Sequence, residues 1–140
     1  MNRYPYLRAY MAGILLPTWV LLIVLAAFLF THLTQRAPAR LESAIVFPMA
    51  IVPNVWGLWN VLYTSLGLRR RISIGAFGSL LPLILVPAGL ALAGALDLGF
   101  YTVQQAAIIL PIAMAIYYLV WKYAVAFFNK VVAPESEPRP

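Results

Sequence analysis

The stretch that decides the fold is residues 9–31, AYMAGILLPTWVLLIVLAAFLFT, in which no side chain is charged. As an α-helix this stretch extends about 35 Å at 1.5 Å per residue, enough to cross a hydrocarbon core of about 30 Å. Three further stretches of similar length and composition lie at residues 44–66, 74–96 and 102–126. Together the four stretches fill most of the 140-residue chain. The sequence therefore predicts an all-α integral membrane protein with four transmembrane helices.

Composition supports one compact membrane domain. Hydrophobic residues make up 64% of the chain and charged residues 10%, whereas soluble domains are about half apolar and a quarter charged. We expect a four-helix transmembrane domain over residues 1–132 and a polar, Pro- and Glu-rich tail at 133–140. The predicted helices cover about 9–33, 44–66, 73–96 and 102–129. Because short loops join consecutive spans, the expected architecture is an up-down antiparallel bundle.

The distribution of positive charge predicts the orientation of this bundle. One side of the membrane receives eight cations, Arg3, Arg8, Arg69, Arg70, Arg71, Lys122, Lys130 and Arg139. The other side receives only Arg36 and Arg40. The positive-inside rule then places both termini and the second loop in the cytoplasm, and we expect a bacterial cytoplasmic (inner) membrane. A nucleic-acid partner is not expected, because the cations flank the spans instead of forming an aromatic-interleaved patch on a soluble face.

The second predicted helix carries the most polar side chains within a span. Trp56, Asn60 and Tyr63 recur at three- or four-residue spacing and therefore share one face, whereas Asn54 lies off that stripe. An amide in hydrocarbon is costly unless it is hydrogen-bonded, so Asn54 and Asn60 should face protein or a water-filled cavity. These four residues are candidates either for lining a pore or for interhelical contacts.

Prolines form a second pattern within the spans. Pro53, Pro87 and Pro111 lie at similar depth, roughly 13 Å from the expected external ends of their helices. Each proline removes a helical hydrogen bond and favours a kink, and kinks at a common level would open an external vestibule. The alternative is that neighbouring helices satisfy the freed carbonyls and the prolines have no further role.

Several shorter signals concern helix ends and close packing. Ser43 is the expected N-cap of the second helix, which should end at Gly67, and the third helix should begin near Ser73. Small residues at four-residue spacing predict tight helix approach. These pairs are Ala9 and Gly13, Gly75 and Ser79, and Gly89 and Ala93.

The remaining polar residues bear on lipid and cofactor binding. Arg69, Arg70 and Arg71 are expected to contact anionic lipid headgroups, at about 1 kcal/mol per cation near the surface. The single histidine, His32, lies near the external end of the first helix. It is interpreted as a solvated boundary residue, with axial ligation of a haem or chlorophyll as the alternative. No cofactor or metal is expected otherwise.

Catalytic chemistry is not expected. The chain has no cysteine, which excludes disulfides, thiolate metal sites and cysteine nucleophiles. No carboxylate lies in the middle of a span, and the intramembrane hydroxyls have no histidine or carboxylate at their depth. The sequence therefore favours a non-enzymatic structural or accessory subunit of a membrane complex or homo-oligomer. A small oligomeric channel or transporter for a small or uncharged solute is the alternative.

Overall fold

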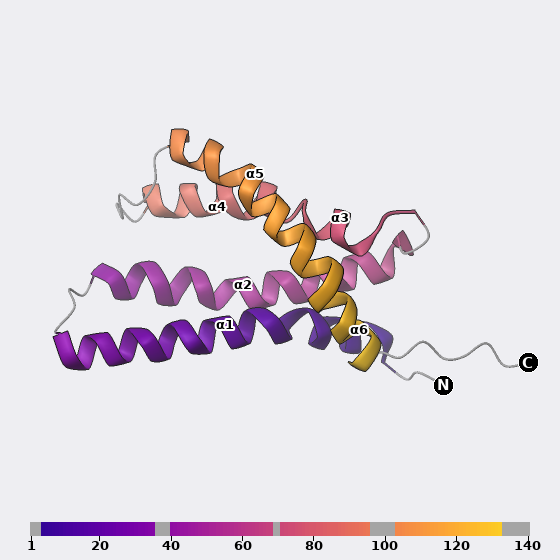
Figure 1. Cartoon of the computed structure of the whole chain (residues 1–140), viewed down its shortest axis with the longest axis horizontal. Helices are drawn as coiled ribbons and strands as arrows, with labels where there is room; N and C mark the ends of the chain where they lie inside the picture. The colour runs from indigo at the N-terminus through magenta and orange to yellow at the C-terminus, as the bar shows by residue number, and fades with distance from the viewer. Residues whose placement is uncertain (1–3, 36–39, 69–70, 96–102, 133–140) are drawn as a thin grey trace, which may run out of the picture.

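The computed structural model of the chain describes residues 4–35, 40–68, 71–95 and 103–132 (Figure 1). For residues 32, 35, 40–50 and 93 only the backbone is described. Within these ranges the regular elements are all helices. Among the described residues, three helical segments are long and apolar enough to cross a membrane, at Pro5–Thr31, Ile74–Leu92 and Val103–Val132. The prediction of an all-helical membrane protein is confirmed to that extent, whereas the predicted tail at 133–140 lies outside the described residues.

The first two helices form a hairpin. Helix α1 spans Pro5–Gln35 and α2 spans Arg40–Ser65, so both begin before the apolar stretches that predicted them. The predicted N-cap at Ser43 is wrong, because the helix has already begun at Arg40. Apolar runs mark the hydrocarbon core, but a helix continues into the headgroup region, where polar side chains are solvated and helical hydrogen bonds remain favourable.

The end of α2 follows the prediction made from Gly67. This glycine has a φ of 62°, a left-handed conformation that costs glycine little and other residues more. The Leu66 N–H donates to the Leu62 carbonyl at 3.0 Å, and the Gly67 N–H donates to the Thr64 carbonyl at 3.3 Å. These bonds satisfy carbonyls of the last turn and terminate the helix.

The predicted single helix over 73–96 is interrupted. It consists of α3 (Ile74–Gly78) and α4 (Pro82–Ala95), separated by a turn. The helix begins next to Ser73 as predicted, and Ser73 caps α3, since its Oγ accepts from the Ala76 N–H at 3.2 Å. Pro82 explains the interruption: it has no N–H to continue the ladder, its ring would clash with the carbonyl of residue 78, and it fits the first position of a new helix.

The fourth predicted helix is continuous but contains a π-helical turn that the sequence did not predict. Its parts are α5 (Val103–Val120), η2 (Trp121–Val125) and α6 (Ala126–Val132). A π turn adds one residue and rotates the side chains that follow. Here it coincides with a close approach to α3, because a Cβ added to Gly78 would lie 2.0 Å from Cγ of Trp121.

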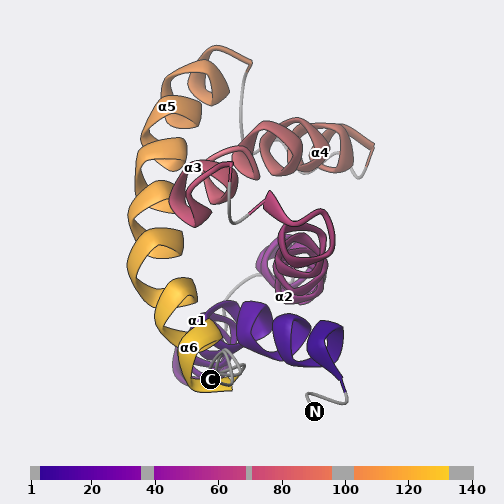
Figure 2. The same ribbon diagram turned by 90° about the vertical axis from the view of Figure 1, so that its right-hand side faces the viewer.

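The elements are arranged as an antiparallel α1–α2 pair crossed by one long rod. Figure 1 shows α5, η2 and α6 running obliquely over the hairpin, and Figure 2 shows α3, α4, α2 and α1 ranged along one side of that rod. Helix α5 packs on α3 and α4, whereas α6 packs on α1. The start of α1, the end of α2 and the end of α6 lie at one end of the molecule (Figure 1). The apolar core lies at the crossing and contains Trp56, Leu81, Trp121 and Val125.

Candidate functional site: a buried amide pair at the helix crossing

Asn60 joins three helices through hydrogen bonds. It is fully buried on α2, and its Nδ2 donates to the Ala9 carbonyl of α1 at 2.6 Å. The same nitrogen donates to Oδ1 of Asn129 on α6 at 2.8 Å, and Asn129 Nδ2 donates back to Asn60 Oδ1 at 3.1 Å. The two amides therefore form a reciprocal pair. Such a pair lowers the cost of placing polar groups away from water, because each amide satisfies the other.

Aromatic side chains also meet where α2 crosses the rod. Trp56 donates from Nε1 to the Tyr117 hydroxyl at 3.4 Å, and the two rings meet edge to face with centroids 5.0 Å apart. Trp121 is fully buried, with its ring centroid 5.5 Å from that of Trp56. Its Nε1 is a buried donor with no hydrogen-bond acceptor among the described residues. The crossing is therefore filled by large rings, which contribute both apolar area and ring-to-ring contacts.

A second set of contacts fixes α2 to the segment that follows it. The Tyr63 hydroxyl donates to the Ile72 carbonyl at 3.0 Å, and Trp59 Nε1 donates to the Phe77 carbonyl at 3.0 Å. The Phe77 ring stacks on Trp59 with centroids 4.8 Å apart and meets Tyr63 at 5.3 Å. Tyr63 and Trp59 therefore hold α3 against the C-terminal half of α2.

Glycines allow close helix approach at two of the three small-residue pairs predicted from the sequence. A Cβ on Gly13 would lie 2.8 Å from the Trp56 carbonyl oxygen and 2.9 Å from Cα of Gly57. A Cβ on Gly75 would lie 3.0 Å from the Tyr118 carbonyl. Gly89 meets nothing within 4 Å, so the close approach predicted for the third pair is not found in the described part of the chain.

The structure separates the four polar and aromatic candidates of α2. Trp56, Asn60 and Tyr63 share the buried face, where they contact α1, the rod and α3. Asn54 is exposed on another face, and its Oδ1 accepts from the Tyr10 hydroxyl of α1 at 2.6 Å. The buried residues are therefore engaged between helices of one chain, whereas Asn54 remains accessible from outside it.

The three prolines do not share one environment. Pro53 lies within α2 and is buried, whereas Pro87 within α4 and Pro111 within α5 are both exposed. The prediction of a vestibule lined by all three gains no support from this placement.

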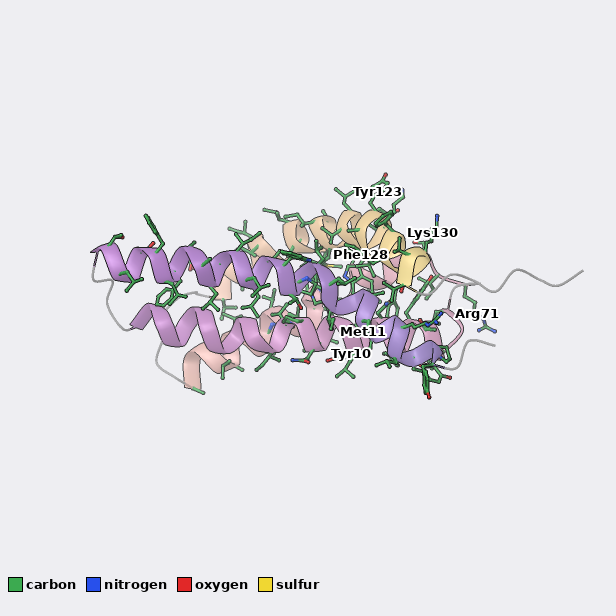
Figure 3. All side chains as sticks on the ribbon, turned by 90° about the horizontal axis from the view of Figure 1, so that it is seen from below. Tyr10, Met11, Arg71, Tyr123, Phe128 and Lys130 are labelled. Atoms are coloured by element: carbon green, nitrogen blue, oxygen red, sulfur yellow. The ribbon has the colours of Figure 1, made fainter. Side chains whose placement is uncertain are left out.

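Positively charged side chains lie at the end of the molecule where α1 begins. Arg71 and Lys130 are exposed there, as Figure 3 shows. Lys122 is also exposed, and its Nζ lies 5.5 Å from the ring centroids of both Tyr118 and Tyr123. Arg69 and Arg70 lie outside the described residues, as does the side chain of His32.

Sequence reasoning missed Asn129, Tyr117 and the π turn at Trp121. Asn129 served only as a marker for the end of the fourth helix. A usable signal was present, because Asn60 and Asn129 lie at comparable distances from the C-terminal ends of their helices, Ser65 and Val132. Two intramembrane amides at one depth are candidates for pairing.

Comparisons with known proteins add no further constraint on the site. No family model, no curated protein and no solved structure matches the chain. Within the described residues, no group of three or more His, Cys, Asp or Glu side chains could hold a metal ion.

Proposed function

We propose that this protein is a non-enzymatic structural or accessory subunit of a membrane complex or homo-oligomer. The observation that carries the proposal is the contrast between the buried polar and aromatic side chains of α2 and the apolar side chains on the outer surface. On the buried face of α2, the side chains of Asn60, Trp56 and Tyr63 are engaged inside the chain. Outward-facing positions instead carry large apolar side chains, including Ile23, Phe30, Leu33, Val103 and Ile108. Surfaces of this kind suit lipid and other membrane helices.

The proposed topology is four spans with both termini in the cytoplasm of a bacterial inner membrane. It is supported by the exposed cations Arg71 and Lys130 at the end of the molecule where α1 begins and α6 ends (Figure 3). At that level of the membrane, cations contact anionic lipid headgroups. We propose these headgroups as lipid partners of Arg69, Arg70 and Arg71.

Site-directed labelling tests this topology. Because the chain has no cysteine, single-cysteine variants can be labelled from one side of intact spheroplasts. Tyr4→Cys and Val131→Cys should resist a membrane-impermeant maleimide, and Leu33→Cys should react with it. Labelling of Tyr4→Cys or Val131→Cys from outside would reverse the orientation.

Purification tests the subunit role. The full chain, extracted in mild detergent or a native lipid disc, should elute as more than one copy or with a stoichiometric second protein. A monomer with no co-purifying protein would contradict the proposal.

Solute flux separates this proposal from the channel or transporter. The buried positions of Trp56, Asn60 and Tyr63 disfavour a conduit along that face of α2 within one chain. Liposomes containing the purified protein should release a small neutral solute no faster than protein-free liposomes. Release that depends on Asn60 would favour the conduit instead.

A further inference from the structure

The π turn of the rod lies between two contacts that fix how the rod is rotated. At the start of the turn, Trp121 packs on Gly78, where an added Cβ would lie 2.0 Å from Cγ of the indole. After the turn, Asn129 pairs with Asn60 at 2.8 and 3.1 Å. Trp121 and Asn129 are both buried, so each is held against another helix.

An unbroken α-helix would not satisfy both contacts. Asn129 lies eight residues after Trp121. At about 100° per residue, their side chains would be about 80° apart around an α-helix. The π turn takes up one extra residue, which lowers this separation to about 20°. The turn therefore brings both side chains onto one face of the rod.

The backbone hydrogen bonding of the turn is divided between two acceptors. The Ala126 N–H donates to the Trp121 carbonyl, five residues back, and also to the Tyr123 carbonyl, three residues back. An α-helical bond would instead reach Lys122, four residues back. Because π turns are rare beside α-helix, this turn depends on the contacts at its two ends.

A buried donor also opposes this arrangement. Nε1 of the fully buried Trp121 has no hydrogen-bond acceptor among the described residues. Burial of such a donor is unfavourable, whereas the reciprocal bonds between Asn60 and Asn129 are favourable. The position of α6 therefore reflects opposing contributions, the condition under which a second packing of the same sequence lies close in free energy.

We propose that α6 is a latch with two rotational positions, docked and released. In the docked position the π turn is present and Asn129 bonds Asn60. In the released position the turn becomes α-helical, α6 rotates by about 100°, and Phe128 takes the direction that Asn129 had. A phenylalanine ring offers the Asn60 amide no hydrogen-bonding group to replace Asn129. Helix α6 then separates from the hairpin, and Trp121 Nε1 becomes free to find an acceptor.

The moving segment is short and lies at one end of the rod. Helix α6 comprises seven residues and packs on α1 (Figure 2). A partner that binds only one position of α6 shifts the population toward that position. The latch therefore provides a means of control at the end of the molecule where α1 begins, whether or not the protein is a subunit of a complex.

Distances between two spin labels in the full chain test for the two positions of α6. The reporter is the exposed Val131→Cys on α6, measured in turn against Leu66→Cys and Met11→Cys, with labelled chains diluted in unlabelled protein. A rotation of about 100° moves a side chain at the helix surface by about 8 Å, so two positions give two distances. Asn129→Ala should raise the released-to-docked ratio about 5- to 10-fold, because only the docked position loses hydrogen bonds.

Deletion of one residue tests the role of the π turn. Tyr123 is 65% exposed and points away from the hairpin (Figure 3). Its deletion leaves Trp121 and Asn129 seven residues apart, so an α-helix can meet both contacts. The shortened chain should keep the parent's tryptophan emission and show only the docked distance. Deletion of Leu119, also exposed but before the turn, is the matched control and should destabilise the fold, because it rotates α5 relative to Trp121.

A single distance that stays unchanged in Asn129→Ala would overturn the released position of α6. Two distances that persist after deletion of Tyr123, or a Tyr123 deletion as damaging as that of Leu119, would show that the π turn is not the moving part. As a check on the reporter, Leu119→Cys in place of Val131→Cys should give one distance in every variant, because it precedes the turn; two distances there would place the motion outside α6 and refute the latch.

Discussion

The buried amide pair gives the sharpest prediction about stability. Asn60→Ala removes three hydrogen bonds, one to the Ala9 carbonyl and two shared with Asn129. Hydrogen bonds between membrane helices average about 0.6 kcal/mol, so these bonds contribute about 2 kcal/mol. The substitution also leaves the buried Asn129 amide without this partner, which costs about 1–3 kcal/mol more. We therefore expect Asn60→Ala to lower the free energy of unfolding by about 3–5 kcal/mol.

The double substitution distinguishes pairing from simple loss of packing. Asn129→Ala alone removes two of the three bonds and leaves Oδ1 of Asn60 without its Asn129 donor, for a cost of about 2–4 kcal/mol. In Asn60→Ala/Asn129→Ala no amide of the pair is left behind. The double variant should therefore be no less stable than Asn60→Ala and should fall short of the summed single effects by about 2 kcal/mol or more.

Unfolding in mixed micelles, followed by tryptophan emission as the denaturing detergent fraction rises, measures these differences. Gln104→Ala is the control, because it removes an exposed amide from the first turn of α5 and should change stability little. Additive single effects, or an Asn129→Ala variant as stable as Gln104→Ala, would refute the reciprocal pair.

Three further predictions follow from the packing and the helix ends. Gly78→Ala should destabilise the fold by about 1–3 kcal/mol or more in the same unfolding assay, because the added Cβ would lie 2.0 Å from Trp121 Cγ. The control is Gly89→Ala, whose Cβ would meet open space and which should be neutral or slightly stabilising. Ser73→Ala should lower stability by about 0.5–2 kcal/mol through loss of the bond from the Ala76 N–H, and Ser73→Asp, which keeps an acceptor, should retain the parent's stability. Equal stability of the parent and both variants would contradict the cap. In single-tryptophan variants, lipids brominated on their acyl chains should quench Trp19, which is 62% exposed, and leave the fully buried Trp121 bright. Equal quenching of both would place Trp121 outside the core.

Local chemistry accounts for the parts of the fold that the sequence predicted correctly. Transfer of apolar side chains from water is nearly additive along the chain, so uninterrupted apolar stretches identify membrane helices without knowledge of their neighbours. The helix start near Ser73 and the helix end at Gly67 depend on bonds within a few residues, and both positions were predicted from residue type alone. The early starts of α1 and α2 were missed because hydrophobicity marks the edge of the lipid and not the end of the helix.

Only the tertiary structure decided which faces of the helices meet. Asn60 pairs with Asn129, 69 positions along the chain, and the π turn brings Trp121 onto Gly78. It also decided that Asn60 is enclosed while Asn54, on the same helix, faces outward. In water, an apolar stripe reveals the buried face of a helix. In a bilayer, lipid tails are as apolar as leucine, so hydrophobicity does not specify the rotation of each helix about its axis. Close approach at glycines and the matching of a few amides specify that rotation instead, and those contacts exist only once the helices have packed.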